Sequence, residues 1–323
     1  MKAHDDVYIL HFDAAKVYTR IMIDPNGLIQ GLSFFRIIPA GSIRDQLASM
    51  KNLPGKVSYL IWTNGKTIAS KAASTPMAVG STFKLAALLA VGEAVDRGSL
   101  AWDEVVALDP AWRSVPSGQL QDWPEGTAVT IATLTHLMIS LSDNTAADAL
   151  IHLVGGETIE QISPQNRPFL TRREAFVLKS EKNDKLRQSW NTATEEGRRR
   201  ILEKIAAFPL TDAKELKKLP DQNTQNVEWF MTAEEICDLL EASHDMPSLS
   251  INQGPIDRAQ WRQYAYKGGS EFGVLNLSSR VVGTDGTSHC IVATWNDDIP
   301  LDNTQFLAPY QGIVDLLHSE TAD

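Results

Sequence analysis

The sequence predicts an α+β protein in which a sheet built from both ends of the chain packs against a helical middle part. Two groups of strand-like segments support this prediction, within residues 57–73 and 264–295, because both groups are rich in β-branched and aromatic residues. Between them lie several stretches whose apolar residues recur at helical spacing. Since the apolar faces of a sheet and of helices must be buried against each other, we expect the early strands to complete one sheet with the late strands.

The individual elements follow from periodicity and turn signals. The expected strands of the main part are 57–63, 67–73, 264–268, 273–282 and 289–295. The expected helices are 81–97, 130–141, 144–154, 171–206, 232–243 and 308–318. Thr171-x-x-Glu174 and Thr232-x-x-Glu235 each match a capping box at the start of a helix.

The N-terminal residues form a unit of their own. Residues 7–37 alternate in β-forming residues and predict a small β-meander. Because so few strands fold poorly alone, we assign residues 1–40 to a short β extension or the remnant of a larger domain. The polar stretch 39–55 is a candidate linker, and we expect the main domain over residues 56–323.

Length and composition limit the possible roles. The chain has 323 residues, of which 43% are hydrophobic, and this is enough for one large core with a small addition. A net charge of -10 argues against nucleic acid as a partner. No apolar run is long enough to span a bilayer. The polar residues 1–6 do not resemble a secretory signal, so we expect a cytoplasmic protein if the chain begins at its natural start. We expect a periplasmic or secreted one if a signal segment was removed. The composition leaves the oligomeric state open.

The chain contains two cysteines, Cys237 in a helical pattern and Cys290 in a strand pattern. Two cysteines do not make a disulfide framework, and no C-x-x-C pair or histidine cluster indicates zinc. We expect two buried thiols, no metal and no cofactor.

The first candidate motif is Ser81-Thr82-Phe83-Lys84. A serine and a lysine three residues apart lie on one face of a helix. At a helix N-terminus the free backbone N–H groups, including that of Ser81, favour developing negative charge. A neutral Lys84 amine can take the serine proton if burial and a second cation lower its pKa. Alone, this motif is weak, because such spacings arise by chance.

The second motif is Ser142-Asp143-Asn144, between two expected helices. Ser142 can pass a proton to a leaving group, and Asn144 can bind a substrate amide carbonyl. The alternative is that Ser142 or Asp143 only caps the following helix.

The third motif is Lys267-Gly268-Gly269-Ser270, at the end of a strand. The glycines, Gly269 included, allow a substrate to approach the strand edge. The backbone N–H groups of Ser270 and Ser81 can then form an oxyanion hole, and Lys267 can be the second cation that keeps Lys84 neutral. The alternative is an exposed strand end with a loose turn.

Together the three motifs match one catalytic set, S-x-x-K, S-D-N and K-T-G, with K-G-G as a variant of the third. On these residues, and on the stretch from Ala73 to Leu85, the chain resembles class A β-lactamases and their penicillin-binding relatives over about residues 56–318. It is also similar to the β-lactamase-like esterases of clavulanic-acid gene clusters, which carry an additional N-terminal domain. The resemblance implies a serine β-lactamase/DD-peptidase-like fold with the active site between an α/β sandwich and an all-α part. The roles it implies are nucleophile for Ser81, base for Lys84, proton shuttle for Ser142, and substrate contacts for Asn144 and Lys267.

The sequence departs from that family in two places. The family's deacylating glutamate, in the pattern E-x-x-L-N, has no match between Ser142 and Lys267. Glu174 is the candidate deacylation base, although the capping box is the commoner role at its spacing. Gly268 replaces the usual Thr or Ser, so Ser270 or Arg280 would have to bind a substrate carboxylate. The alternative for Arg280 is a surface arginine with no such role.

We therefore expect a serine hydrolase that is acylated at Ser81 by a β-lactam or an ester and that deacylates slowly from β-lactams. A D-Ala-D-Ala peptidase and a β-lactam-binding sensor or non-catalytic binding module remain alternatives. The expected partner is a small molecule: a β-lactam, an ester or a peptide-like amide. The charged segment 179–226 is expected to be a solvated helical face that can wall the cleft, with Trp190 and Trp229 at its entrance or in the core.

Overall fold

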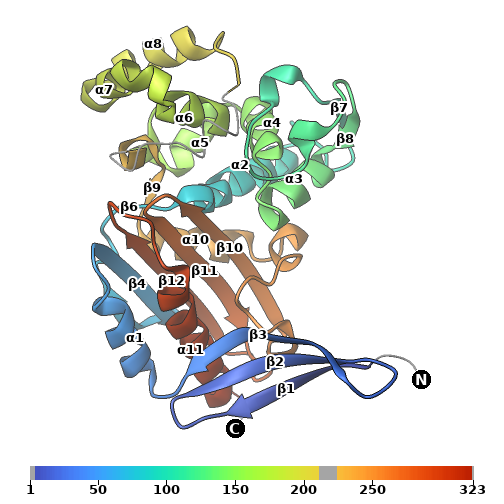
Figure 1. The fold of residues 1–323 in the computed structure, drawn as a ribbon. Coiled ribbons are helices and arrows are strands. Elements are labelled where there is room, and N and C mark those ends of the chain that lie inside the picture. The colour runs from blue at the N-terminus through green and yellow to red at the C-terminus, as the bar shows by residue number, and fades with distance from the viewer. Residues whose placement is uncertain (1–3, 211–223, 322–323) are drawn as a thin grey trace.

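The computed structural model describes residues 4–210 and 224–321. Its centre is a five-stranded antiparallel sheet with the strand order β10-β11-β12-β4-β5 (Figure 1). The strands are β4 (Lys56–Thr63), β5 (Lys66–Lys71), β10 (Gln263–Glu271), β11 (Val274–Val282) and β12 (Ser288–Asn296). The early hairpin joins the three late strands beside β12, which confirms the predicted sheet.

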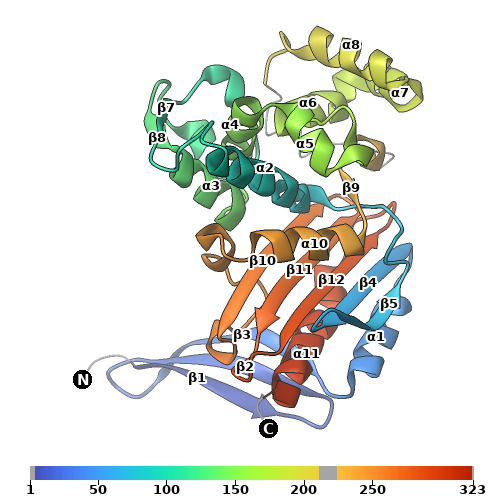
Figure 2. The ribbon, with the colours of Figure 1, turned by 180° about the vertical axis from the view of Figure 1, so that it is seen from behind.

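Helices cover both faces of this sheet. Helices α1 (Ile43–Lys51) and α11 (Asn303–Thr321) pack together on one face, and α10 (Ala233–Ser243) lies on the other (Figures 1 and 2). The core between the sheet and α1 and α11 includes Leu47, Met50, Val281, Ile291, Phe306 and Val314. A second and larger core continues from the α10 face into the helical part. The α+β prediction is therefore confirmed.

The middle of the chain folds into a helical part beyond one end of the sheet (Figure 2). Its helices are α2 (Lys84–Asp96), α3 (Ile131–Ser140), α4 (Asn144–Val154), α5 (Gly156–Ile162), α6 (Arg172–Lys179), α7 (Asp184–Thr192) and α8 (Glu195–Ile205). Its short strands pair as β6 (Met77–Ala78) with β9 (Phe230–Met231) and as β7 (Val105–Ala107) with β8 (Ala128–Thr130). Helix α2 is apolar on nearly all sides and lies at the centre, as expected for a buried helix.

Short 3-10 helices complete the described chain. They are η1 (Gly80–Phe83), η2 (Pro110–Trp112), η3 (Leu120–Asp122), η4 (Pro164–Asn166), η5 (Glu181–Asn183), η6 (Thr224–Val227), η7 (Pro247–Ser250) and η8 (Arg258–Gln260). In residues 4–210 and 224–321, no helix combines the length and the apolar character needed to cross a bilayer.

Residues 39–55 differ from the expected linker, because they contain helix α1. Ser42 begins the helix with a capping box, in which its side chain accepts from the Asp45 backbone and the Asp45 carboxylate accepts in return. Leu47 and Met50, three residues apart, are buried against the main sheet. Four apolar residues in nine, one of them the small Ala48, gave too short a helical pattern to stand out in the sequence.

Residues 4–39 form a three-stranded meander, as the sequence predicted for residues 7–37. Strands β1 (His4–His11), β2 (Ala15–Ile23) and β3 (Ile29–Pro39) pair in that order and extend from the main body as an arm (Figure 1). The arm contacts the body mainly through β3 and α11. Whether this arm is the remnant of a larger domain stays a prediction.

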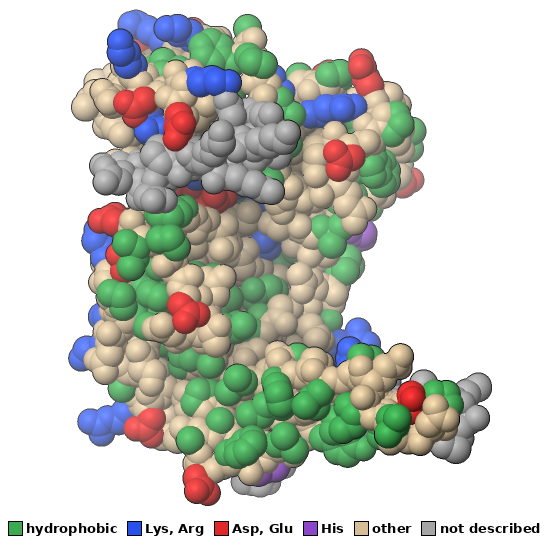
Figure 3. Space-filling view, in the orientation of Figure 1, with side chains coloured by type: hydrophobic (Ala, Val, Ile, Leu, Met, Phe, Trp, Pro, Cys, Tyr) green, Lys and Arg blue, Asp and Glu red, His purple; other side chains and the backbone are tan. Residues whose placement is uncertain are grey.

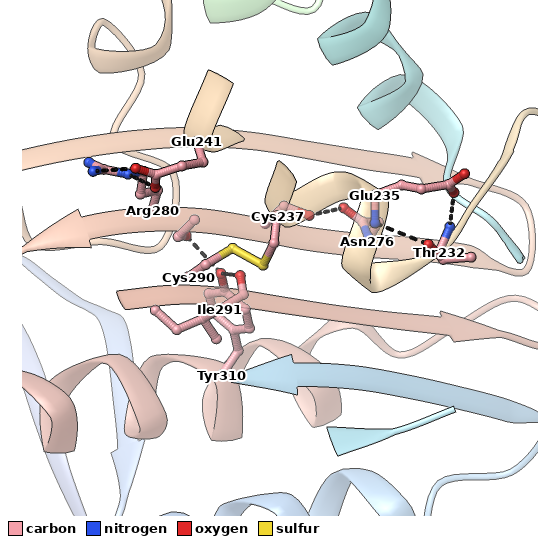
Figure 4. The surroundings of a disulfide bond; sticks show 11 residues. Thr232, Glu235, Cys237, Glu241, Asn276, Arg280, Cys290, Ile291 and Tyr310 are labelled. Carbon is pink, nitrogen blue, oxygen red and sulfur yellow. Dashed lines mark hydrogen bonds and ion pairs between the residues drawn. A yellow bond between two sulfur atoms is a disulfide. The ribbon is translucent and has the colours of Figure 1, made fainter. Parts of the chain in front are cut away.

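The expectation of two free thiols was wrong. Cys237 of α10 and Cys290 of β12 form a disulfide that ties the helix to the sheet beneath it (Figure 4). The two residues are 53 positions apart, and they meet only because α10 crosses the face of β11 and β12. No local pattern in the sequence carries that information.

The charged segment is only partly a solvated face. Trp190 and Trp229 are both buried in the larger core, so neither lies at a cleft entrance. Trp229 stacks on Phe83, with ring centroids 3.9 Å apart, directly below the start of α2. Part of the predicted segment, residues 211–223, lies outside the described residues.

Candidate active site

Ser81 lies in the 3-10 turn that leads from β6 into α2, at the N-terminal end of the buried helix. The backbone of this turn requires a glycine before the serine, because Gly80 has a φ of +50°. A Cβ atom at Gly80 would also lie only 3.1 Å from the Ser270 backbone nitrogen. Ser81 is buried except for 8% of its surface and lines a cavity of about 410 Å³.

The residues that border this cavity come from both halves of the fold. They are Ser81, Pro116, Ser117, Ile139, Ser140, Leu141, Ser142, Arg172, Asn252, Tyr266, Lys267, Gly268, Gly269, Ser270, Glu271, Leu275, Asn276 and Leu277. The residues from Ser81 to Arg172 belong to the helical part, and those from Tyr266 to Leu277 belong to strands β10 and β11. The cavity therefore lies between the all-α part and the sheet, where the resemblance placed it.

Ser142 brings the first two motifs together. It lies between α3 and α4 with a φ of 54°, a conformation that is uncommon outside glycine. Lys84 Nζ lies 2.6 Å from the Ser142 carbonyl oxygen and 3.2 Å from Ser142 Oγ. Lys84 Nζ also donates to Asn144 Oδ1 at 2.8 Å. The S-x-x-K and S-D-N residues are thus in direct contact, although 58 positions separate Lys84 from Ser142.

The third motif reaches the same hydroxyl from the sheet. Lys267 Nζ lies 3.2 Å from Ser142 Oγ and donates to the Gly268 carbonyl oxygen at 2.6 Å. The Ser142 hydroxyl therefore lies within hydrogen-bond distance of two lysine amines. The sequence prediction that these motifs converge on one site is consistent with this geometry.

Burial and mutual repulsion lower the pKa values of both lysines. Burial holds the pKa of Lys84 well below its usual value, and the nearby charges of Lys267 and then Arg172 lower it further. Burial, followed by the charge of Arg172, lowers the pKa of Lys267 to about 7. A lysine in this environment can be a neutral amine near neutral pH and can accept a proton.

Gly269 allows strand β10 to lie directly against the turn that carries Ser81. A Cβ atom at this position would lie 2.7 Å from the Ser81 backbone nitrogen and 2.8 Å from that of Thr82. Any residue with a side chain would therefore push the strand away from the serine. Thr82 adds a further connection, because its hydroxyl donates to Asn276 Oδ1 of β11 at 2.8 Å. The Ser270 backbone is held beside the serine by these contacts.

Three expected site residues have other contacts. Asn144 does not border the cavity, since its Oδ1 accepts from Lys84 and its Nδ2 donates to the Val115 carbonyl oxygen at 3.0 Å. Glu174 is also absent from the cavity wall: its carboxylate accepts from both the backbone and the hydroxyl of Thr171, in the predicted capping box. Asn144 thus orients Lys84, and Glu174 stabilises the start of α6.

Arg280 lies outside the cavity as well. Its Nε and Nη2 donate to the Glu241 carboxylate of α10 at 2.5 and 3.1 Å, on the sheet face that α10 covers (Figure 4). The guanidinium group that was expected to bind a substrate carboxylate is thus already bound to the carboxylate of Glu241. The reason lies in strand alternation, which directs Arg280 toward α10.

Sequence reasoning missed a buried charge cluster beside the cavity, made of Arg172, Lys179, Glu228 and Glu271. Arg172 pairs with Glu271, Lys179 pairs with Glu228, and Lys179 Nζ lies 3.9 Å from Glu271. The Arg172 guanidinium also lies over the rings of Phe176 and Trp229, with its carbon 4.5 and 5.1 Å from the two ring centroids. Arg172 and Glu271 border the cavity. The available signal was an α6 sequence whose charges flank an apolar run, but that pattern also fits a solvated helix.

Asp148 fixes the position of α6 and hence of Arg172. Its carboxylate accepts the backbone N–H groups of Arg172 and Arg173 at 2.6 and 2.8 Å. Carboxylates favour the N-terminal end of a helix in this way. In the described part of the chain, no group of three His, Cys, Asp or Glu residues is arranged to hold a metal ion.

Comparison with known proteins identifies the family of this chain. A family model described as "Beta-lactamase enzyme family" (Beta-lactamase2) matches residues 42–242, more than half of the chain. The β-lactamase VEB-1 of Pseudomonas aeruginosa is 26% identical over 119 residues, which are 35% of this chain and 36% of that protein. The chain thus matches about a third of the length of that curated relative.

Solved structures share the fold at low identity. A β-lactamase from Sphaerobacter thermophilus DSM 20745 superimposes with a TM-score of 0.59 at 21% identity, covering 86% of this chain and 96% of that one. PBP-A superimposes with a TM-score of 0.57 at 13% identity, covering 86% and 95%. These likenesses show the serine β-lactamase/DD-peptidase-like fold. Together with the extent of the family match, they lead to one conclusion: the chain belongs to the β-lactamase enzyme family.

Proposed function

We propose that this protein is a serine hydrolase that forms an acyl-enzyme at Ser81 and acts on an ester or a β-lactam. The main support is the contact of Lys84 and Lys267 with the Ser142 hydroxyl, beside a cavity that Ser81 also borders. Two buried lysines with lowered pKa values have little structural benefit, because each costs desolvation energy. Such groups are typical of catalytic sites.

Acylation begins with a proton transfer. Neutral Lys84 takes the proton of Ser81 Oγ, and the serine oxygen attacks the substrate carbonyl carbon. The negative charge on the carbonyl oxygen is stabilised by the backbone N–H groups of Ser81 and Ser270, which the glycine at 269 allows to lie side by side. The N-terminal end of α2 adds a favourable dipole.

Leaving-group departure uses the Ser142 hydroxyl. As the bond between the carbonyl carbon and the leaving oxygen or nitrogen breaks, the leaving atom takes the Ser142 proton. The Ser142 oxygen regains a proton from the Lys84 ammonium, which had received it from Ser81, so the proton count balances. Lys267, which contacts the same oxygen, stabilises the transient negative charge on it.

Deacylation distinguishes esters from β-lactams. Glu174 is engaged in its capping box, and Glu271 is ion-paired with Arg172, so neither carboxylate is a free base for the hydrolytic water. The pKa of Glu271 is also lowered, despite burial, by the charges of Lys179 and Arg172. An alcohol leaves the site after ester acylation, whereas the amine of an opened β-lactam stays attached to the acyl group. We therefore expect efficient turnover of esters and slow deacylation of β-lactams.

A β-lactam-binding sensor is the second candidate, and it is favoured by the engagement of Glu174 and Glu271 in other contacts. A protein that is acylated readily but deacylates very slowly would bind its β-lactam covalently and signal its presence. A D-Ala-D-Ala peptidase is a third possibility, for which the fold likeness to PBP-A gives the only support.

Three measurements separate these functions. Hydrolysis of p-nitrophenyl acetate and of nitrocefin reports turnover, and intact-protein mass after benzylpenicillin reports acylation. Turnover of the ester with slow nitrocefin hydrolysis supports the proposal, and a stable mass increase without any turnover supports the sensor. The Ser81→Ala variant should be neither acylated nor active. Retained activity in that variant would refute the proposed nucleophile.

A further inference from the structure

Exposed apolar side chains are concentrated on the N-terminal sheet. In the described part of the chain, eighteen large hydrophobic side chains are exposed, and twelve of them lie within residues 7–37. They form an apolar patch over β1, β2 and β3 in the space-filling view (Figure 3). Soluble proteins rarely leave so much contiguous apolar surface uncovered unless it binds something.

One face of this sheet is already used by the body of the protein. Lys16 forms an ion pair with Asp315 of α11 at 3.2 Å, and Arg36 lies 3.7 Å from Asp257. Lys16 is directly opposite Ile38, and Tyr18 is opposite Arg36, so these four side chains share one face. Ile38 and Arg36 are buried there.

Strand alternation places Val17, Thr19, Ile21 and Ile23, with the residues opposite them, on the other face, which we call the outer face. Val7 and Ile9 are paired with Arg20 and Tyr18 and so belong to the first face. The strand register brings Leu10, Val17 and Ile37 into one row, Tyr8, Thr19 and Phe34 into the next, and Ile21 and Leu32 into a third, followed by Ile23 and Ile29. Thr19 is the one polar residue among these ten, and none of the ten is charged. The third and fourth rows end on β1, where Asp6 is paired with Ile21 and His4 with Ile23. Six of the side chains are 37–64% exposed: Tyr8, Leu10, Ile29, Leu32, Phe34 and Ile37.

The size of the outer face matches an interface. Six half-exposed large side chains and three partly buried ones present on the order of 700 Å² of apolar surface, taking aromatic and aliphatic side chains at about 150–200 Å² when fully exposed. A stable protein–protein interface buries roughly 800 Å² on each partner. The largest patch on a monomeric protein is about 300–600 Å². The outer face therefore exceeds the surface expected of a monomer and approaches the area that a dimer requires.

We propose that two copies of this chain pack outer face against outer face to form a homodimer. The ten residues named above are apolar except for Thr19, and their area approaches that of a dimer interface, so two identical copies of this face can cover each other. A two-fold axis brings the same residues of both copies together, as in most homodimers. The product is a two-layer β-sandwich, in which apolar side chains from the two sheets interdigitate at a layer spacing of about 10 Å.

The proposed interface lies far from the active site. The arm extends from the end of the main sheet opposite to the helical part, and the outer face includes none of the residues that border the Ser81 cavity (Figure 1). The dimer is therefore independent of the proposed hydrolase function, and each can fail without the other.

Charge substitutions on the outer face test the proposal. Light scattering coupled to gel filtration, with sedimentation velocity across micromolar concentrations, should show a wild-type dimer. Phe34→Lys and Leu32→Lys should each yield a monomer, because two facing ammonium groups would be buried without partners. Ile299→Lys changes an equally exposed apolar residue outside the sheet, and it should remain dimeric.

The outcomes are decisive in both directions. A wild-type monomer at high micromolar concentration would overturn the proposal, and so would a dimer that survives both outer-face substitutions. A wild-type monomer that binds phosphatidylcholine vesicles would also overturn it and would assign the face to a membrane. Circular dichroism and p-nitrophenyl acetate hydrolysis check that the lysine variants stay folded, since both substituted residues are more than half exposed.

Discussion

Gly269→Ala perturbs the closest approach between the sheet and the nucleophile. The added methyl group would lie 2.7 Å from the Ser81 backbone nitrogen and 2.8 Å from that of Thr82, and closer still to the Val79 carbonyl oxygen. All three are backbone atoms, so no side-chain rotation can relieve the overlap. The strand and the serine turn must separate, by on the order of 1 Å given how little free space packed interiors contain.

This displacement is large compared with the tolerance of an oxyanion hole. The two backbone N–H donors must lie about 2.7–3.1 Å from the developing oxyanion, and removing one of them typically lowers kcat about a hundredfold to a thousandfold. A shift of the strand moves the Ser270 donor while the Ser81 donor stays on its helix. We therefore expect kcat for p-nitrophenyl acetate to fall by about that factor. Overpacking should also lower the free energy of unfolding by about 1–3 kcal/mol.

The assay compares this variant with a matched glycine substitution. Gly156→Ala adds the same methyl group at the start of α5, where the new atom would lie in ordinary van der Waals contact with the Phe169 carbonyl oxygen at 3.7 Å. That variant should retain nearly full activity. If Gly269→Ala is folded by circular dichroism and keeps its kcat within about threefold of wild type, the oxyanion-hole assignment of β10 is refuted.

Three further predictions follow from burial and contacts. Replacing Cys237 and Cys290 by serine should lower the free energy of unfolding by about 4 kcal/mol in the loop-entropy model, since the disulfide closes a segment of 53 residues; urea unfolding measures this. The pKa of Lys267 is about 7 in the fold and 10.5 as its ordinary value, so the folded protein binds fewer protons than the unfolded chain between these pH values. The free energy of unfolding should therefore rise with pH across this window, and it should rise less in the Lys267→Met variant. Because this substitution removes a charge that lowers the pKa of Lys84, it should also raise that pKa. The acidic limb of the kcat/KM profile should then move to higher pH. Glu174→Gln should change the deacylation rate little, as followed by intact-protein mass, because that carboxylate belongs to a capping box.

Each of these predictions has a result that contradicts it. Equal stability with and without the disulfide would mean that the cysteines are not paired in solution. An acidic limb that Lys267→Met leaves in place would remove the electrostatic coupling between the two lysines. Accumulation of acyl-enzyme in Glu174→Gln would identify that glutamate as the deacylation base.

Local patterns in the sequence were sufficient for most secondary structure. The strands near residues 57–71 and 264–296 and the helices on either side of Ser142 carry their own periodicity, and the structure confirms them. Helix α1 was missed because its apolar pattern is short, and a polar stretch with glycines also fits a linker. The expected helical stretch 171–206 is divided into three helices, since the caps at Ser180 and Ala193 are extended.

The candidate site was predictable to the extent that one catalytic chemistry requires particular residue types at particular spacings. Ser81, Lys84, Ser142 and Lys267 could be selected because a nucleophile, a base, a proton shuttle and a second cation each demand their own side chain. Arg280 could not be placed, because its direction depends on which sheet face α10 covers.

By itself the sequence determined most of the strands and helices and the α+β fold class, and it singled out the four side chains of the proposed chemistry. Only the tertiary structure decided how α10 meets β12 through a disulfide, how α6 brings Arg172 against Glu271, and that an apolar face of the arm stays uncovered. The physical reason is the range of the interactions. Periodicity and capping act over a few residues and can be read along the chain, whereas disulfides, buried ion pairs and uncovered faces depend on contacts between segments that are distant in sequence.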